Sequence, residues 1–187
     1  MKRLLYLLSA FLILSCSKKE EMISPDSIYN VGSVWEKQDG NKISFIDFKG
    51  KVLVTTMIFT SCKTACPRLT AEMKKIENEV GKVSPDNIEY VLISIDPETD
   101  TPEVMKAYLK THQLDEKEWM FIRSNENDTR EIANIMAVKY KEISPIEFSH
   151  SNIISVYSKN GTLAYQKEGL DNDIQRTAKE IKKQLEL

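Results

Sequence analysis

The sequence predicts an α/β domain in which helices flank a central mixed β-sheet, with a β-hairpin at its N-terminal end. Three long apolar runs rich in β-branched residues are typical of strands buried on both faces. Segments with helical apolar spacing alternate with these runs, which predicts parallel strands joined by right-handed crossovers. The chain closes with a strand, a tight turn, a strand and a helix, which predicts an antiparallel pair crossed by a terminal helix.

The first half of the chain contains the hairpin, one core strand and one helix. Val31–Phe48 predicts the hairpin, with a turn at Asp39–Asn41 and a second strand running to Phe48. Val52–Phe59 is a nearly unbroken apolar run and predicts the first core strand. A helix is expected from about Ala65 to Val80, because apolar residues there recur at helical spacing and a proline falls in the first turn.

The second half continues the alternation of strands and helices. Strands are expected at 90–95, 118–122, 152–157 and 163–166, and helices at 101–112, 128–137 and 171–185. The whole order is that of a thioredoxin-like fold, and no internal repeat or second domain is visible.

Composition and charge indicate a single domain and argue against nucleic-acid binding. The chain has 187 residues, of which 41% are hydrophobic and 29% charged, enough for one domain with a real core. The net charge is -2, and no basic stripe of the kind that nucleic-acid binding requires is present.

The N-terminus predicts export and a lipid anchor. Lys2 and Arg3 precede the apolar run Leu4–Leu14, which is shorter than the ~20 residues of a membrane-spanning helix but suits a signal peptide. The run ends at Ser15-Cys16, which resembles a bacterial lipobox and implies cleavage after Ser15 and lipid on Cys16. The alternative is an ordinary signal peptide that happens to contain a cysteine.

This interpretation divides the chain into three parts. We expect a lipoprotein signal peptide at 1–15, a tether at 16–30 and the thioredoxin-like domain at 31–187. The mature protein is then an extracytoplasmic, membrane-anchored lipoprotein, periplasmic where a second membrane exists.

Once Cys16 is set aside, two cysteines remain, Cys62 and Cys66. They follow the first core strand at the mouth of the first helix, where backbone N–H groups and the helix dipole stabilise a thiolate. A pair in an oxidising compartment can be a disulfide, a redox couple or two metal ligands. The loop between them is very small, so a purely structural disulfide would stabilise the domain little.

Three segments resemble the Sco/SenC family. Phe59–Pro67 (FTSCKTACP) is similar to its metal-site loop, Ile93–Pro102 (ISIDPETDTP) to its second signature, and Phe148–Ser151 (FSHS) to its third. The resemblance runs from about residue 31 to the end, with the motifs in family order. Two positions depart from the pattern: Lys63 replaces a common proline, and Ser149 replaces a common aspartate.

The resemblance implies a copper metallochaperone. Cys62, Cys66 and His150 would bind Cu(I) or Cu(II), a donor set that suits copper because thiolates favour Cu(I) and imidazole accepts either state. Family members are membrane-tethered and help to mature the copper centre of cytochrome c oxidase. The implied partners are the copper-bearing subunit of that oxidase or another copper acceptor, and a protein that donates the copper.

Other polar residues near these motifs have competing roles. His150 precedes a core strand, and we expect a loop to bring it against the cysteines. Asp100 resembles a helix N-cap with Glu103 as its capping-box partner. Alternatively, it contacts and orients the metal-binding side chains without binding the metal itself. Asp96 ends a strand near the cysteine loop and has the same supporting alternative. His112 is expected to be a solvated residue at a helix end.

The main competing function is a thiol–disulfide oxidoreductase, so the sequence leaves open whether the protein is an enzyme. Cys62 would attack a disulfide and Cys66 would resolve the mixed disulfide. His150 discriminates between the two, because a dithiol reductant does not need it. A peroxidase is disfavoured, since Phe59 stands where the peroxiredoxins have threonine.

Overall fold

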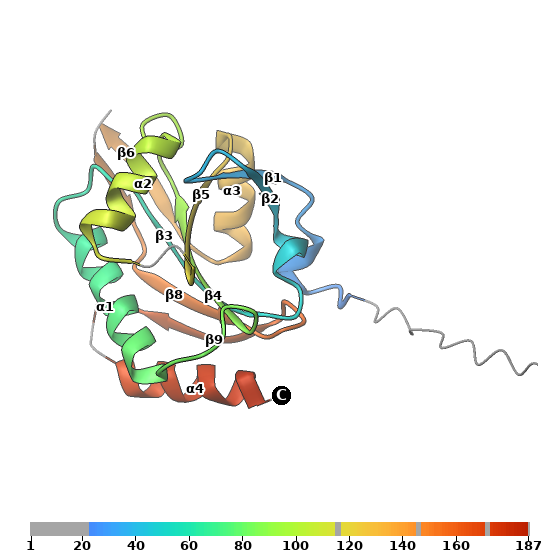
Figure 1. The fold of residues 1–187 in the computed structure, drawn as a ribbon. Coiled ribbons are helices and arrows are strands. Elements are labelled where there is room, and N and C mark those ends of the chain that lie inside the picture. The colour runs from blue at the N-terminus through green and yellow to red at the C-terminus, as the bar shows by residue number, and fades with distance from the viewer. Residues whose placement is uncertain (1–22, 115–116, 145–146, 171–172, 187) are drawn as a thin grey trace, which may run out of the picture.

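A computed structural model describes residues 23–114, 117–144, 147–170 and 173–186. Within these ranges a seven-stranded sheet has the order β2-β1-β5-β4-β3-β8-β9 (Figure 1). β3 lies parallel to β4, and β4 to β5, whereas β8 pairs antiparallel with β3 and β9 with β8. The strands are β1 (Val34–Lys37), β2 (Lys42–Ser44), β3 (Val52–Ile58), β4 (Ile88–Ser94), β5 (Trp119–Arg123), β8 (Ile153–Tyr157) and β9 (Leu163–Glu168).

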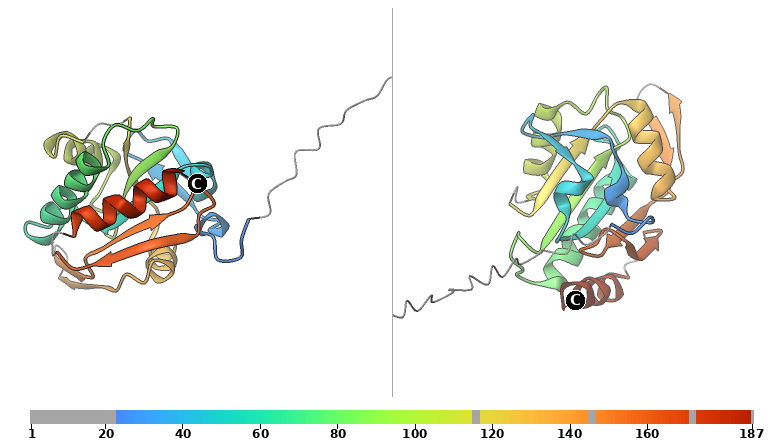
Figure 2. Two further views of the ribbon diagram at one scale, coloured as in Figure 1. Left: turned by 90° about the horizontal axis from the view of Figure 1, so that it is seen from below. Right: turned by 90° about the vertical axis from the view of Figure 1, so that its right-hand side faces the viewer.

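Helices cover both faces of this sheet. They are α1 (Ala65–Val80), α2 (Pro102–Thr111), α3 (Glu126–Ile135) and α4 (Ile174–Glu186). Neighbouring residues of β9 show the two layers, because successive side chains of a strand point to opposite faces. Lys167 pairs with Glu72 of α1, whereas Gln166 donates to the carbonyl of Met136 at the end of α3. α4 packs beside α1, as the views in Figure 2 also show. The predicted α/β fold with a mixed sheet is confirmed.

The sheet carries the core. Every residue of β3 and β4 is buried, as their mostly apolar sequences predict, and the buried residues include the polar Thr55, Thr56 and Glu89. Trp119 is fully buried and stacks on Tyr90 with ring centroids 5.0 Å apart. No helix in the described ranges has the length and apolar character needed to cross a membrane.

The chain enters the domain through a short 3₁₀ helix, η1 (Ile28–Asn30), which lies inside the segment expected to be tether. The Ser27 hydroxyl donates to the carbonyl of Asn160, and the Tyr29 hydroxyl donates to that of Phe48. Both side chains are buried, so packing against the domain extends to Ser27. Residues 1–22, with the expected signal peptide and Cys16, lie outside the described ranges.

Two elements differ from expectation. Phe45–Phe48 is a 3₁₀ helix, η2, because the Asp47 carboxylate accepts a hydrogen bond from the Ser44 N–H and turns the chain. A separate two-stranded sheet, β6 (Tyr140–Ser144) and β7 (Glu147–His150), was not predicted. β6 is largely exposed and lacks an apolar run that would indicate a strand.

A buried ion pair fastens α1 to the sheet. Lys167 Nζ lies 2.7 Å from Glu72 Oε1, and the two side chains are only 3% and 5% exposed. Lys167 Nζ also donates to the carbonyl of Gly169 at 2.8 Å. Removing one partner would leave the other charge buried without its counter-ion, which costs more than the pair itself contributes.

We therefore expect Lys167→Met to lower the free energy of unfolding by about 3–5 kcal/mol, measured by urea denaturation. The matched double variant Glu72→Leu/Lys167→Met should recover most of the loss, because neither charge then remains. A single variant as stable as the parent would contradict a structural role for this pair.

Candidate metal centre

The first thiol of the pair lies in the loop after β3. Cys62 is half-buried, and its Sγ accepts a hydrogen bond from the N–H of Cys66 at 3.3 Å. Burial pushes the pKa of Cys62 upward, but the N–H groups of Cys66, Thr64 and Ala65, with the Cys66 thiol, outweigh burial and hold it below the usual thiol value. The predicted thiolate-stabilising helix mouth is therefore present.

The second thiol has the opposite environment. Cys66 is the second residue of α1 and is fully buried. Burial, together with the neighbouring sulfur of Cys62, raises the pKa of the Cys66 thiol. Both cysteines are free. The pair thus combines an accessible sulfur that ionises readily with an enclosed one that retains its proton.

The imidazole of His150 meets the enclosed thiol. His150 Nε2 lies 3.2 Å from Cys66 Sγ, although the two residues are 84 positions apart. The downstream imidazole therefore lies against one of the two cysteines, Cys66. His150 ends β7 and was expected in a loop, so that expectation is wrong: the unpredicted hairpin delivers the ring.

The surroundings of His150 favour a neutral ring with its lone pair toward sulfur. Its Nδ1 lies 3.0 Å from the carbonyl of Ser151, an acceptor, so we assign the ring proton to Nδ1 and the lone pair to Nε2. Burial lowers the pKa of His150, an effect that the Ser151 contact only partly offsets. Phe59 packs against the ring with centroids 5.9 Å apart and against Phe148 at 5.1 Å, which excludes water from this side.

These donors fit a soft metal ion. Two sulfurs and one imidazole nitrogen match the preference of Cu(I), and a neutral imidazole also accepts Cu(II). Among the residues that the structure describes, no three Cys, His, Asp or Glu side chains stand ready-made around one point.

A buried carboxylate holds the start of the cysteine loop. Asp100 is fully buried, and its Oδ1 accepts hydrogen bonds from the Thr60 hydroxyl and, at 3.1 Å, from the Thr60 N–H. Its Oδ2 accepts from the Ser94 hydroxyl at 2.5 Å. Burial raises the pKa of Asp100 despite these donors. Thr60 lies two residues before Cys62, so Asp100 ties the second motif to the first.

The expected N-cap role of Asp100 is wrong. Thr101 caps α2, and its side chain accepts a hydrogen bond from the Val104 N–H at 3.4 Å. Aspartate and threonine are both common N-cap residues. Pro102 lies in the first turn whether the N-cap is Asp100 or Thr101, so it does not distinguish between them. The Asp100 carboxylate instead points into the protein and accepts hydrogen bonds from Thr60. The sequence alone could not show this partner, because the two residues are 40 positions apart.

Asp96 and His112 are held by partners other than the cysteines and His150. Asp96 is buried and shapes its own turn: its N–H donates to the Ser94 hydroxyl at 3.0 Å, and its carbonyl accepts from the Asp100 N–H at 3.0 Å. His112 is the C-cap residue that follows α2. It is half-buried, not solvated as expected, and its ring centroid lies 4.2 Å from that of Tyr108. Burial lowers the pKa of His112.

Comparisons with known proteins give relatives of this chain in sequence and in fold. The family model described as SCO1/SenC matches residues 32–186. The SCO1 protein homolog of Bacillus subtilis (strain 168) is 27% identical over 143 residues, 74% of this chain and 72% of that protein. A SCO1/SenC family lipoprotein from Bacillus anthracis str. Ames is 25% identical, with a TM-score of 0.74 over 81% of this chain and 91% of its own. Arabidopsis thaliana ScoI with copper bound shares the fold, with a TM-score of 0.71, 18% identity, and 82% and 95% coverage.

The matched residues span all three motifs and the elements that bring Cys62, Cys66 and His150 together. The chain belongs to the SCO1/SenC family.

Proposed function

We propose that this protein is a lipid-anchored, extracytoplasmic copper carrier that binds Cu(I) or Cu(II) through Cys62 Sγ, Cys66 Sγ and His150 Nε2. The 3.2 Å contact between Cys66 Sγ and His150 Nε2 is the observation that carries the proposal, because it places an imidazole lone pair beside the cysteine pair. A relative of the same fold has been solved with copper bound, which supports copper as the cargo.

The two thiols have separate parts in capturing the ion. Cys62 is the more accessible thiol and the one whose pKa is lowered, so it meets the arriving ion first. Cys66 then exchanges its proton for the metal, and His150 provides the third ligand. The two sulfurs cannot hold copper while joined in a disulfide, so loading requires the reduced pair. Asp100 anchors the cysteine loop through Thr60, and Asp96 supports the site through the turn that it forms with Asp100, whose N–H donates to the Asp96 carbonyl.

The copper passes from a donor protein to an acceptor. Membership of the SCO1/SenC family supports the copper-bearing subunit of cytochrome c oxidase, or another copper acceptor, as the recipient. The related lipoprotein of Bacillus anthracis supports anchoring through lipid on Cys16, which would keep the carrier at the membrane where such an acceptor lies.

A second function is favoured by the unequal thiols. Cys62 as thiolate can attack a protein disulfide, forming a mixed disulfide and expelling one partner thiolate. Cys66, after losing its proton, then attacks Cys62 Sγ, which closes the Cys62–Cys66 disulfide and frees the second partner thiolate. The partner is reduced by two electrons and this chain is oxidised by two. His150 has no part in that exchange, so it separates the two functions.

We expect His150→Ala to weaken Cu(II) binding more than Cu(I) binding, because two thiolates alone still satisfy Cu(I). Competition titrations with chelators of each oxidation state measure the difference. His112→Ala is the matched control and should change neither affinity. If His150→Ala instead reduced disulfide reductase activity toward insulin as much as copper binding, the oxidoreductase would be the better description.

Copper affinity should rise with pH. The raised pKa of Cys66 means that its thiol is protonated at neutral pH and must lose that proton to bind. Each proton released strengthens binding by about tenfold per pH unit below that pKa. Anaerobic Cu(I) competition at pH 6, 7 and 8 should show this slope, whereas affinities independent of pH would contradict the assignment of Cys66.

Replacing the proposed lipid site should release the protein from membranes. Cys16→Ala removes the only sulfur that can carry the diacylglyceryl group at the proposed cleavage site. Fractionation should then find the variant in the soluble fraction and the parent with membranes. A variant that stays with membranes would show that another segment anchors the chain.

A further inference from the structure

We propose that a groove beside His150, between the β6–β7 hairpin and α3, is the docking site for an extended, positively charged segment of the protein with which this chain exchanges copper. The inference rests on the proposed function and adds the surface and the kind of partner. The groove has a volume of about 450 Å³ and is bordered by the loop after β4, the first half of α3 and the hairpin. The right-hand view of Figure 2 shows the hairpin at the rim of the molecule, beside α3.

The groove is continuous with the candidate metal centre. Phe148 lines the groove and packs on Phe59, whose ring also contacts that of His150. Tyr140, another lining residue, is the cross-strand partner of His150 in the hairpin. Cross-strand partners project from the same face of a sheet. A chain lying in the groove would therefore lie one side chain away from His150, which does not itself line the groove.

The groove offers an open strand edge. Within the described strands, β6 pairs only with β7. The Ser151 N–H donates to the Lys139 carbonyl at 2.8 Å, which sets the alternation: Lys139 and Lys141 direct their backbone groups toward β7, and Tyr140 and Glu142 direct theirs away. Tyr140, Glu142 and Phe148 line the groove from one face of the hairpin, and Lys141, which points to the other face, lines it too, so the outer edge of β6 also borders the groove. An extended segment can add to such an edge through backbone hydrogen bonds.

The charges of the groove select a cationic segment. Four carboxylates line it, against two cations, and one of those cations, Arg130, is already paired with Glu126. Glu98 and Glu142 are exposed on opposite sides of the groove. Lysine or arginine side chains of a bound strand would meet this excess of negative charge, which favours both encounter and register.

Two polar atoms of the lining lack partners. Asp96 Oδ2 and the Tyr140 hydroxyl are buried without a hydrogen bond in the structure, and Asp96 is only 7% exposed. Buried polar groups left unpaired cost free energy. Both atoms are covered in the unbound structure, so a bound segment pairs with them only if the side chains that cover them move aside.

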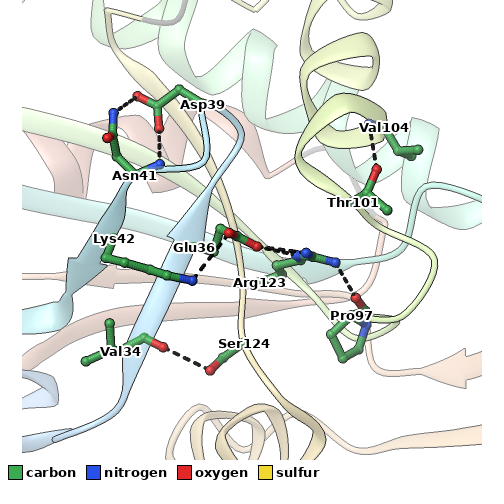
Figure 3. A network of polar contacts seen from close by, with 10 residues as sticks. All are labelled: Val34, Glu36, Asp39, Asn41, Lys42, Pro97, Thr101, Val104, Arg123 and Ser124. Carbon is green, nitrogen blue, oxygen red and sulfur yellow. Dashed lines mark hydrogen bonds and ion pairs between the residues drawn. The ribbon is translucent and has the colours of Figure 1, made fainter.

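The wall opposite β6 is held in place. Arg123 of β5 donates from Nη1 to the carbonyl of Pro97 at 2.9 Å and from Nε to Glu36 Oε2 at 2.9 Å (Figure 3). Glu36 also pairs with Lys42. These contacts fix the loop after β4, so the groove presents a preformed wall, and binding does not have to pay for ordering it.

The test uses the mature, metal-free, reduced lipoprotein in non-ionic detergent and a fluorescent, acetylated and amidated peptide, KVKVKVK. We expect saturable binding by fluorescence anisotropy at low salt. Glu98→Lys/Glu142→Lys should weaken it by about tenfold or more and leave Cu(I) affinity unchanged. The matched control Glu79→Lys/Asp86→Lys, which reverses two exposed carboxylates outside the groove lining, should bind the peptide as the parent does.

A second peptide separates strand addition from charge alone. KPKPKPK has the same charge but lacks the alternate N–H groups that pair with an edge, so it should bind much more weakly. Three results would overturn the proposal. The two peptides could bind equally well, binding could fail to saturate at millimolar peptide, or the two charge-reversal variants could have equal effects. Sedimentation showing that a second copy of this chain covers the groove would also overturn it. The peptide assay contains no copper. Loss of peptide binding would therefore not affect the copper-binding results, and a failure to bind copper would not affect the peptide-binding result.

Discussion

The contact between Cys66 and His150 is the constraint on which the rest of the structure depends. Its two atoms come from a helix start and a strand end 84 residues apart, so both elements must be fixed independently. The buried Glu72–Lys167 pair joins α1 to the sheet. Phe59 and Phe148 pack the hairpin against the end of β3. Without both anchors the imidazole would not lie beside the thiol.

The electrostatics of the site follow from how these elements meet. Cys62 faces the N–H groups at the start of α1, and they stabilise its anion. Cys66 and His150 are enclosed, and burial favours the neutral form of each. An accessible thiol with a lowered pKa, beside two enclosed neutral donors, suits an ion that arrives from solvent and is then surrounded. In the part of the chain that the structure describes, the Asp100 carboxylate is hydrogen-bonded by Thr60 and Ser94, and through Thr60 it fixes the loop that presents Cys62.

The strands and helices that carry the cysteine pair could be predicted because their residues act locally. β3 and β4 are mostly apolar runs, and α1 begins at Ala65 as its proline and apolar spacing indicate. The hairpin could not be predicted in this way. β6 is mostly exposed, and its pairing with β7 is set by tertiary packing rather than by an apolar pattern. The inward turn of Asp100 was missed for the same reason, because its partner Thr60 is distant in the sequence.

The central claim is that one copper ion is held by two sulfurs and one imidazole nitrogen. X-ray absorption spectroscopy of the reduced protein loaded with one equivalent of Cu(I) tests this claim most directly. The account predicts two sulfur scatterers and one imidazole per copper, with the imidazole scattering lost in His150→Ala. Copper bound by sulfur alone in the parent protein, or copper whose surroundings contain no sulfur, would contradict it.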